Sequence, residues 1–292
     1  MNVAIGLPST IPGASGASIV EWASRAEARG FSSLATLDRL VYPGYDPLVA
    51  LSAAAAVTSR IGLLTSILIT PLRTTAVVAK QLASLDRLSE GRLTVGVALG
   101  GREDDYLAIG RTTSGRGAVL ASQLEEFRRI WAGESPSGCT RGIGPEPWSA
   151  GGPPILLGAF TESAIRRGIS HAAGWISGGL PPDQFRAVAD SIKDGWRSSG
   201  REGEPRLLAN TYFCLGADAR ATADAYIHDY YAFLGDQAAW VAAGAATEPV
   251  AVQAMVAAYA DAGCDEILIH PCSSDPAQVD LLADALGRSG ES

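Results

Sequence analysis

Three residues at the ends of apolar runs carry groups suited to acid–base or anion chemistry. Asp38 and Arg39 follow one such run, and His270 ends another. A carboxylate and an imidazole can exchange protons with a substrate, and the imidazole does so near neutral pH. A guanidinium does not lose its proton in proteins, so Arg39 can hold an anion but cannot act as a base. The alternative for Arg39 is a structural ion pair with Asp38 or Asp46.

A glycine-rich turn is the next candidate for binding. Gly100 and Gly101 have no Cβ, so their backbone can approach a planar ring or a phosphate closely. Arg102 follows them and is a candidate for contacting a cofactor. Asp104 and Asp105 are expected to be exposed acids at a helix start, where the helix dipole favours negative charge.

A helix start after another apolar run offers an anion site. The sequence reads Gly158-Ala159-Phe160-Thr161-Glu162-Ser163. Free backbone N–H groups at a helix start, together with the hydroxyls of Thr161 and Ser163, can bind a phosphate. Thr161 is equally suited to capping the helix.

Eight short apolar runs, most of them separated by helical patterns, must position these groups. The runs are Val3–Leu7, Ser33–Leu37, Gly62–Leu68, Leu93–Ala98, Ile155–Gly158, Gly174–Ser177, Leu207–Cys214 and Glu266–His270. Strands that alternate with helices predict an α/β fold, a (β/α)₈ TIM barrel whose site lies at the carboxyl ends of the strands. The competing open sheet is disfavoured because Gly6-Leu7-Pro8 is not a dinucleotide-binding turn.

The stretch from Gly62 to Gly101 reads as one strand–helix–strand unit. Its helix carries apolar residues at helical spacing, namely Val78, Leu82, Leu85 and Leu88. From Ser66 onward this stretch resembles the signature region of the bacterial luciferase-like monooxygenases. That family contains flavin- and deazaflavin-dependent enzymes on a TIM barrel, and the weaker resemblance extends from Val3 to about Leu286.

The resemblance implies roles for particular residues. Ser66-Ile67 fall where the family has a bulge with a non-proline cis peptide behind the flavin ring. The turn at Gly100-Gly101 corresponds to the one that passes the flavin, and the helix start at Gly158, Ala159, Phe160, Thr161 and Ser163 corresponds to the phosphate site.

The sequence also departs from the family pattern. Where the family typically has a histidine after the acid, this chain has Arg39. Where the family often has a His-Pro pair, it has Thr74-Thr75. Arg73, in the same loop, is a candidate for a cofactor or structural role.

The composition predicts one domain, residues 1–292, with a sizeable core. Hydrophobic residues make up 47% of the chain. The net charge of -8 and the lack of a Lys/Arg cluster argue against nucleic acid as a partner. The four cysteines and three histidines have no metal-site spacing. No run reaches membrane-span length and no leader pattern precedes the first strand, so we expect a cytoplasmic protein.

Two segments exceed minimal barrel connections. Residues 134–154 are rich in Gly, Pro and Ser and are expected to form a lid-like loop. Residues 217–247 are expected to form a helical insertion packed on the outside of the barrel. A role in capping the substrate or forming a dimer is the alternative.

Three functions are consistent with these features. The first is an FMN-dependent monooxygenase that uses O₂ and reduced flavin from a partner reductase to oxygenate a small organic substrate. The second is an oxidoreductase that transfers hydride with the deazaflavin coenzyme F420. The third is a flavin-binding protein without catalysis. The resemblance also implies a homodimer.

Overall fold

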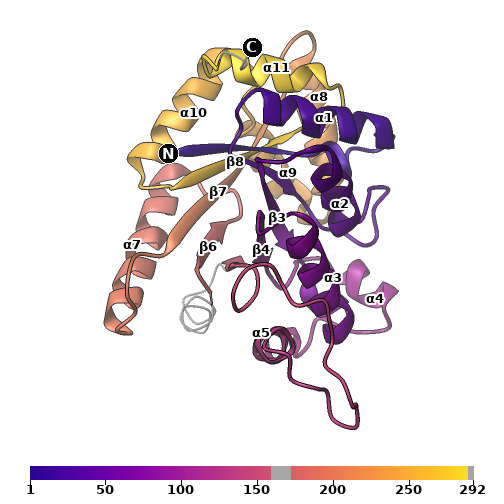
Figure 1. Cartoon of the computed structure of the whole chain (residues 1–292). Helices are drawn as coiled ribbons and strands as arrows, with labels where there is room; N and C mark the ends of the chain where they lie inside the picture. Colours follow the sequence, from indigo (N-terminus) through magenta and orange to yellow (C-terminus); the bar gives the residue numbers. More distant parts are fainter. Residues whose placement is uncertain (159–171, 289–292) are drawn as a thin grey trace.

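The computed structural model describes residues 1–158 and 172–288, and its strands close into a barrel (Figure 1). Neighbouring strands pair in parallel in chain order, and β8 closes the ring by pairing with β1. The strands are β1 (Asn2–Gly6), β2 (Ser33–Thr36), β3 (Gly62–Leu68), β4 (Leu93–Val97), β5 (Ile155–Gly158), β6 (Gly174–Ser177), β7 (Arg206–Phe213) and β8 (Glu266–Pro271). The predicted TIM barrel is confirmed, and the open sheet is excluded.

Helices follow most of the strands and cover the outside of the barrel (Figure 1). The described helices are α1 (Gly16–Ala28), α2 (Pro47–Val57), α3 (Thr75–Leu88), α4 (Glu103–Ala108), α5 (Arg116–Trp131), α7 (Pro182–Ser198), α8 (Ala219–Tyr230), α9 (Ala238–Ala243), α10 (Pro249–Asp261) and α11 (Ala277–Ala285). Short 3₁₀ helices are η1 (Pro8–Thr10), η2 (Thr70–Leu72) and η3 (Ala232–Gln237). The predicted helix Glu162–His171 lies outside the described residues.

Local sequence signals account for where helices begin and end. The Asp46 carboxylate accepts the Leu48 and Val49 N–H groups at 2.9 and 3.2 Å, and Pro47 is the first residue of α2. Gly30, the second residue after α1, adopts a φ of 70°, a conformation that favours glycine. The apolar face predicted for α3 is one turn too long, because its last residue, Leu88, is 71% exposed.

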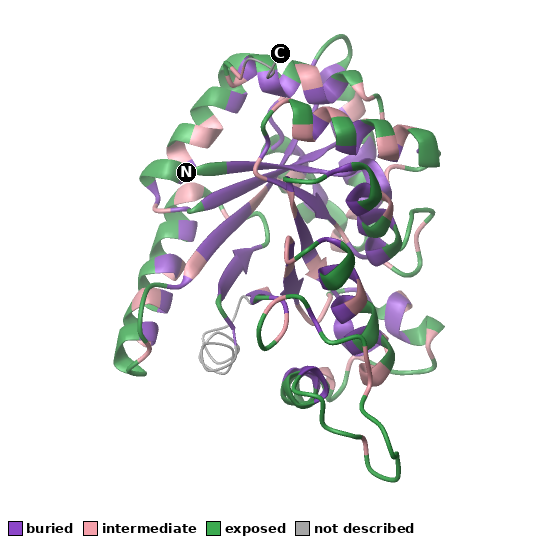
Figure 2. Cartoon of the chain, viewed as in Figure 1, coloured by how far each residue is buried: buried purple, intermediate pink, exposed green. Residues whose placement is uncertain are grey.

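The core has two layers, one inside the barrel and one between strands and helices. Figure 2 shows that most of the strand residues are buried, whereas the helices have buried and exposed residues in alternation. The inner layer consists of Ala4, Ala35, Leu64, Leu156, Ile176, Leu208 and Leu268. Strand β4 contributes Gly96 there, and a Cβ on Gly96 would lie 2.2 Å from the Thr65 carbonyl oxygen and 2.5 Å from Ile176 Cδ1. The barrel is therefore filled by side chains at this level, so a ligand can bind only beyond this layer.

The loop 134–154 lies at the other end of the barrel from the expected site. It precedes β5, and its Ser149 backbone N–H donates to the buried Asp86 carboxylate near the end of α3 at 2.8 Å. The Lys80 ammonium donates to the Gly144 carbonyl, and Trp148 packs under Arg87. These contacts hold residues 144–149 beside α3, toward the amino ends of the strands. This part of the loop does not cover the carboxyl ends, in contrast to the predicted lid.

The Asp86–Ser149 contact gives a stability prediction. Asp86→Ala is expected to destabilise the fold by about 1–3 kcal/mol, because it leaves the Ser149 N–H without its partner. Chemical denaturation measures the difference, with Ser84→Ala at a partly exposed position of α3 as the control. Equal stabilities of the two variants would contradict the assigned role of Asp86.

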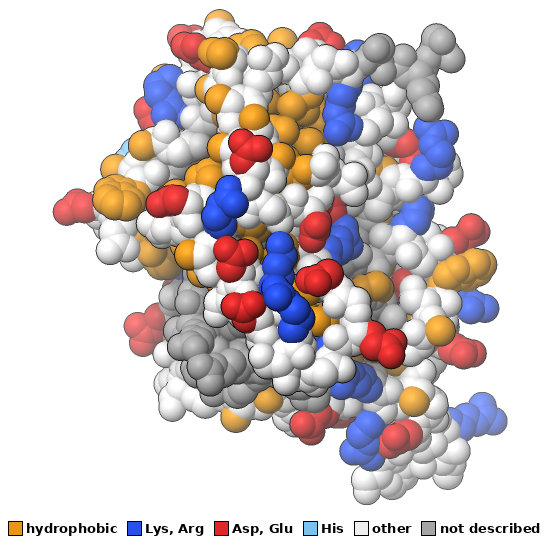
Figure 3. Space-filling model, turned by 90° about the vertical axis from the view of Figure 1, so that its left-hand side faces the viewer, with side chains coloured by type: hydrophobic (Ala, Val, Ile, Leu, Met, Phe, Trp, Pro, Cys, Tyr) orange, Lys and Arg blue, Asp and Glu red, His pale blue; other side chains and the backbone are white. Residues whose placement is uncertain are grey.

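Some apolar side chains remain at the surface. Figure 3 shows apolar groups gathered among charges of both signs on the face that carries α7 and α10. Val250 of α10 and Trp240 of α9 are 65% and 82% exposed. Exposed apolar residues of this kind are compatible with a dimer interface. The homodimer itself stays a prediction. Within the described ranges, each helix is too short or too polar to cross a bilayer.

Candidate active site

The carboxyl ends of the strands form a mouth above the inner core layer. Side chains alternate along a strand, so residues two positions beyond the inner layer also point inward. They include Gly6, Ser66, Ala98, Gly158, Asn210 and His270. The mouth has two dissimilar sides, one apolar and one polar.

The apolar side, here called the open wall, consists of Ile67, Ala98 and Gly158 at the ends of β3, β4 and β5. All three remain partly exposed although they face inward. A Cβ on Gly158 would lie 3.0 Å from Ala98 Cβ and 3.1 Å from Ile67 Cγ2, so these residues adjoin one another. A side chain at position 158 would project over this wall. The small, uncharged residues fit the face of a flat heterocycle.

The backbone features predicted near this wall are present. The Ser66-Ile67 peptide is cis, and the pairing of β3 with β4 shifts register between Thr65 and Leu68. The predicted cis bond and bulge are therefore confirmed. Gly100 has a φ of 69°, and a Cβ there would lie 2.9 Å from Ile69, so the turn requires glycine.

The polar side is a hydrogen-bonded group, here called the polar floor, of Ser66, Asn210 and His270. Ser66 Oγ donates to Asn210 Oδ1 at 2.5 Å, and His270 Nε2 lies 2.9 Å from the same oxygen. Asn210 Nδ2 donates to the Ser177 carbonyl at 3.0 Å. Asn210 was not predicted from the sequence, because the polar residue between Leu208 and Tyr212 becomes a candidate only once the inward face of β7 is known.

His270 is not suited to the predicted acid–base role. Its side chain is 1% exposed, and burial lowers its pKa to about 3. The imidazole is neutral near pH 7 and donates its Nε2 hydrogen to Asn210, because an amide oxygen can only accept. His270 therefore acts as a hydrogen-bond donor within the floor.

Asp38 forms a buried ion pair, but with a different arginine from the one expected. Arg73 Nη1 lies 3.1 Å from Asp38 Oδ2, and Arg73 Nη2 donates to Asp46 at 2.8 Å. Asp38 also accepts the Ile69 N–H at 2.8 Å. Burial raises the pKa of Asp38 to about 6 against the opposing effect of Arg73. These contacts give Arg73 a structural role. The alternative considered for Arg39, an ion pair with Asp38 or Asp46, is wrong, because Arg73 pairs with both acids.

Arg39 and Arg102 instead meet at the end of α8. Both guanidinium groups donate to the Tyr230 carbonyl oxygen, at 3.4 Å from Arg39 and 3.1 Å from Arg102. Arg39 Nη2 also pairs with Asp104 at 3.1 Å. Two cations thus satisfy a carbonyl at the negative end of the helix. The contacts predicted for both arginines with a ligand stay predictions.

The acids after the glycine turn are less exposed than predicted. Asp105 is 1% exposed, and its Oδ1 accepts the Leu40 and Val41 N–H groups at 3.0 and 2.7 Å. Asp104 is tied to Arg39. The two carboxylates fasten the loop after β2 to the turn after β4. Both acids lie in the first turn of α4, as predicted, but the prediction of exposure is wrong for Asp105.

Residues 217–247, here called the capping segment, pack over the mouth rather than on the outside of the barrel. Tyr226 Oη lies 2.8 Å from Thr10 Oγ1 in the loop after β1, and Tyr231 Oη lies 2.9 Å from Tyr212 Oη on β7. Arg102 lies 4.3 Å from the centroid of the Phe233 ring. The contacts favour the capping alternative over the preferred prediction of an outer helix pair.

A substitution tests how the capping segment is held. Arg102→Met is expected to destabilise the fold by about 1–3 kcal/mol, because it removes the donor to Tyr230 and the cation–π contacts but keeps an apolar stem. Urea denaturation measures the cost, with the exposed Arg197→Met as the control. If the two variants were equally stable, Arg102 would not hold the segment.

Several predicted phosphate-site residues cannot be compared with the structure. Ala159, Phe160, Thr161 and Ser163 lie outside the described residues. Gly158 is described and belongs to the open wall. The prediction that the phosphate binds at this helix start remains untested.

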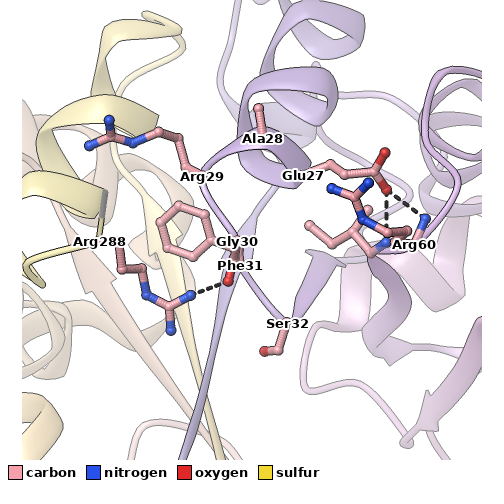
Figure 4. Close-up of a pocket in the computed structure, with 9 residues that line it drawn as sticks. Glu27, Ala28, Arg29, Gly30, Phe31, Ser32, Arg60 and Arg288 are labelled. Carbon is pink, nitrogen blue, oxygen red and sulfur yellow. Dashed lines mark hydrogen bonds between the residues drawn. The ribbon is translucent and has the colours of Figure 1, made fainter. Parts of the chain in front are cut away.

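A separate cavity of about 380 Å³ lies at the amino ends of the strands (Figure 4). It is lined by residues 27–32 and 60–61 and by Arg288. Glu27 accepts the N–H groups of residues 59–61, and Arg288 donates to the Gly30 carbonyl. The lining groups thus hold together the loops that lead into β2 and β3 and the C-terminal part of the chain. This end of the barrel is remote from the mouth.

The chain is similar to known proteins over most of its length. A family model described as luciferase-like monooxygenase matches residues 1–285. An uncharacterized protein of Mycobacterium tuberculosis is 35% identical over 174 residues, which cover 56% of this chain and 60% of that protein. A second from the same organism is 30% identical over 199 residues, covering 59% of this chain and 68% of that protein. The match thus spans less than two thirds of the first relative.

Solved structures share the fold at low sequence identity. A monooxygenase from Streptomyces bottropensis aligns with a TM-score of 0.76 at 21% identity, covering 98% of both chains. An F420-dependent secondary alcohol dehydrogenase, solved with an F420–acetone adduct, gives 0.79 at 15% identity over 100% of both chains. The F420-dependent tetrahydromethanopterin reductase from Methanopyrus kandleri gives 0.76 at 17% identity, covering 97% of both.

Proposed function

Because this chain belongs to the luciferase-like monooxygenase family, whose members are flavin-type oxidoreductases, we propose that it oxygenates a small organic substrate with reduced FMN and O₂. Reduced flavin would supply the electrons, so that one oxygen atom enters the substrate and the other leaves as water. A separate flavin reductase would supply the reduced flavin. The open wall carries the proposal, because it offers an apolar face at the barrel mouth.

The residues of the mouth support binding and shielding rather than proton transfer. Ile67, Ala98 and Gly158 would contact the ring, and the capping segment would limit the access of water. His270 stays neutral, and Arg39 is held by Asp104 and Tyr230. Oxidation of an alcohol by hydride transfer needs a group that takes the hydroxyl proton. Neither His270 nor Arg39 is suited to that task, and the Asp38 carboxylate is held by Arg73 and the Ile69 N–H, which favours oxygenation over alcohol dehydrogenation.

An anaerobic titration followed by an O₂ pulse tests the proposal. Reduced FMN is expected to bind, and the pulse is expected to return oxidised FMN with kinetics that differ from those of free flavin. Tight binding of reduced F420 in place of FMN would overturn the monooxygenase assignment and favour hydride transfer. Binding of FMN with an O₂ reaction identical to that of free flavin would favour a non-catalytic carrier.

A further inference from the structure

Asn210 is the member of the polar floor that a ligand can reach. Ser66 and His270 are buried, with 2% and 1% exposure, whereas Asn210 remains partly exposed. It faces inward from β7, across the barrel from the ends of β3 and β4. Asn210 therefore presents a polar group to the space beside the open wall.

The orientation of the Asn210 amide is fixed by its partners. The Ser177 carbonyl can only accept, so Nδ2 must face it and Oδ1 must face Ser66 and His270. Oδ1 then accepts two hydrogen bonds. Nδ2 carries two hydrogens, and the part of the chain that the structure describes accounts for one of them. The other is available to a ligand in the mouth.

The surroundings select the chemistry of that ligand. Ile67, Ala98 and Gly158 are uncharged, and the His270 imidazole is neutral. Among the described residues of the open wall and the polar floor, a charged group would lose its water without gaining an opposite charge. A neutral acceptor such as a carbonyl oxygen needs one donor, and Asn210 provides it in a fixed position.

We propose that Asn210 is a substrate-binding residue whose free Nδ2 hydrogen donates to the carbonyl oxygen of a small, neutral, largely apolar substrate. Ser66 and His270 are positioning residues that hold the amide in this orientation. The proposal rests on the proposed function, since it names the substrate class on which the oxidation would act. Donation to the carbonyl would orient the substrate between the floor and the open wall.

Matched probes separate the hydrogen bond from apolar binding. Cyclic ketones from cyclopentanone to cyclooctanone are titrated by calorimetry, alongside the analogues in which a methylene group replaces the oxygen. Cyclohexanecarboxylate is the charged probe. The wild type is expected to bind the best ketone roughly tenfold more tightly than its methylene analogue, which corresponds to about one charge-neutral hydrogen bond.

Two variants test whether Asn210 is the donor. Asn210→Leu removes all polar atoms, and Asn210→Asp keeps acceptors for Ser66 and His270 but has no amide hydrogen. Both are expected to reduce the preference for ketone over methylene analogue to about one, with binding of the methylene analogue unchanged in Asn210→Leu. A variant that keeps the preference would overturn the proposal. So would a wild type that binds no ketone, or one that prefers the carboxylate.

The same titrations are run with and without FMN. Ketone preference that depends on Asn210 in protein that fails to bind FMN would support this inference and overturn the proposed function. FMN binding and reaction with O₂ without any ketone preference would support the proposed function and overturn this inference.

Discussion

Gly158→Val is expected to weaken binding of reduced FMN by about a hundredfold or more. The valine side chain would stand on the open wall, since even a Cβ there lies 3.0 Å from Ala98 Cβ and 3.1 Å from Ile67 Cγ2. Excess volume of this size costs about 3 kcal/mol when neighbours cannot move, which corresponds to roughly two decades in affinity. Fluorescence titration under anaerobic conditions measures the change.

Graded and control variants make this result interpretable. Gly158→Ala adds one methyl group and is expected to weaken binding less than valine does. Gly117→Val adds the same side chain on the exposed side of α5, where nothing lies within 4 Å of the added Cβ. It is expected to leave FMN binding unchanged. Near-native FMN affinity in a folded Gly158→Val protein would show that the ring does not lie on this wall.

Replacing His270 is expected to change how stability depends on pH. The pKa of His270 is about 3 in the folded protein, whereas a histidine in the unfolded chain has its ordinary value near 6.5. Below pH 6.5 the imidazole of residue 270 binds a proton in the unfolded chain, whereas in the folded protein it stays unprotonated until the pH approaches 3. The histidine thus contributes a loss of stability as the pH falls from 6.5 towards 3.

The effect is measured as a difference between two proteins. The wild type is expected to lose about 2.5 kcal/mol relative to His270→Gln between pH 6 and pH 4, because only the wild type contains this titrating group. Asp38, whose pKa is raised to about 6, acts in the opposite direction but is present in both proteins. Its contribution therefore cancels in the difference.

Denaturant unfolding at several pH values provides the comparison. His228→Gln, on the exposed surface of α8, controls for the loss of a histidine as such. Stability curves of wild type and His270→Gln that run parallel from pH 6 to pH 4 would contradict the neutral, buried state assigned to His270.

Local signals in the sequence were sufficient to predict the barrel, but not to predict which side chains pair with one another. Strands buried on both faces appear as apolar runs, and the run Gly62–Leu68 coincides with β3. The choice between Arg39 and Arg73 as the partner of Asp38 depends on how loops cross in space. Both arginines lie in loops after strands, so spacing could not rank them.

Two other differences have identifiable causes. Asn210 cannot be identified as a site residue until the inward face of β7 is known, because the run Leu207–Cys214 has polar residues on both faces. The loop 134–154 was predictable in principle. A segment that leads into a parallel strand must lie at the amino end of the barrel, opposite the mouth. Its length alone suggested a lid.

A crystal structure of the protein with FMN would show where the flavin ring binds. We expect the ring to lie against Ile67, Ala98 and Gly158, on the side of the mouth that adjoins the Ser66-Ile67 peptide. A ring bound elsewhere, such as in the cavity near Arg288, or a mouth that remains closed to FMN under saturating conditions, would contradict it.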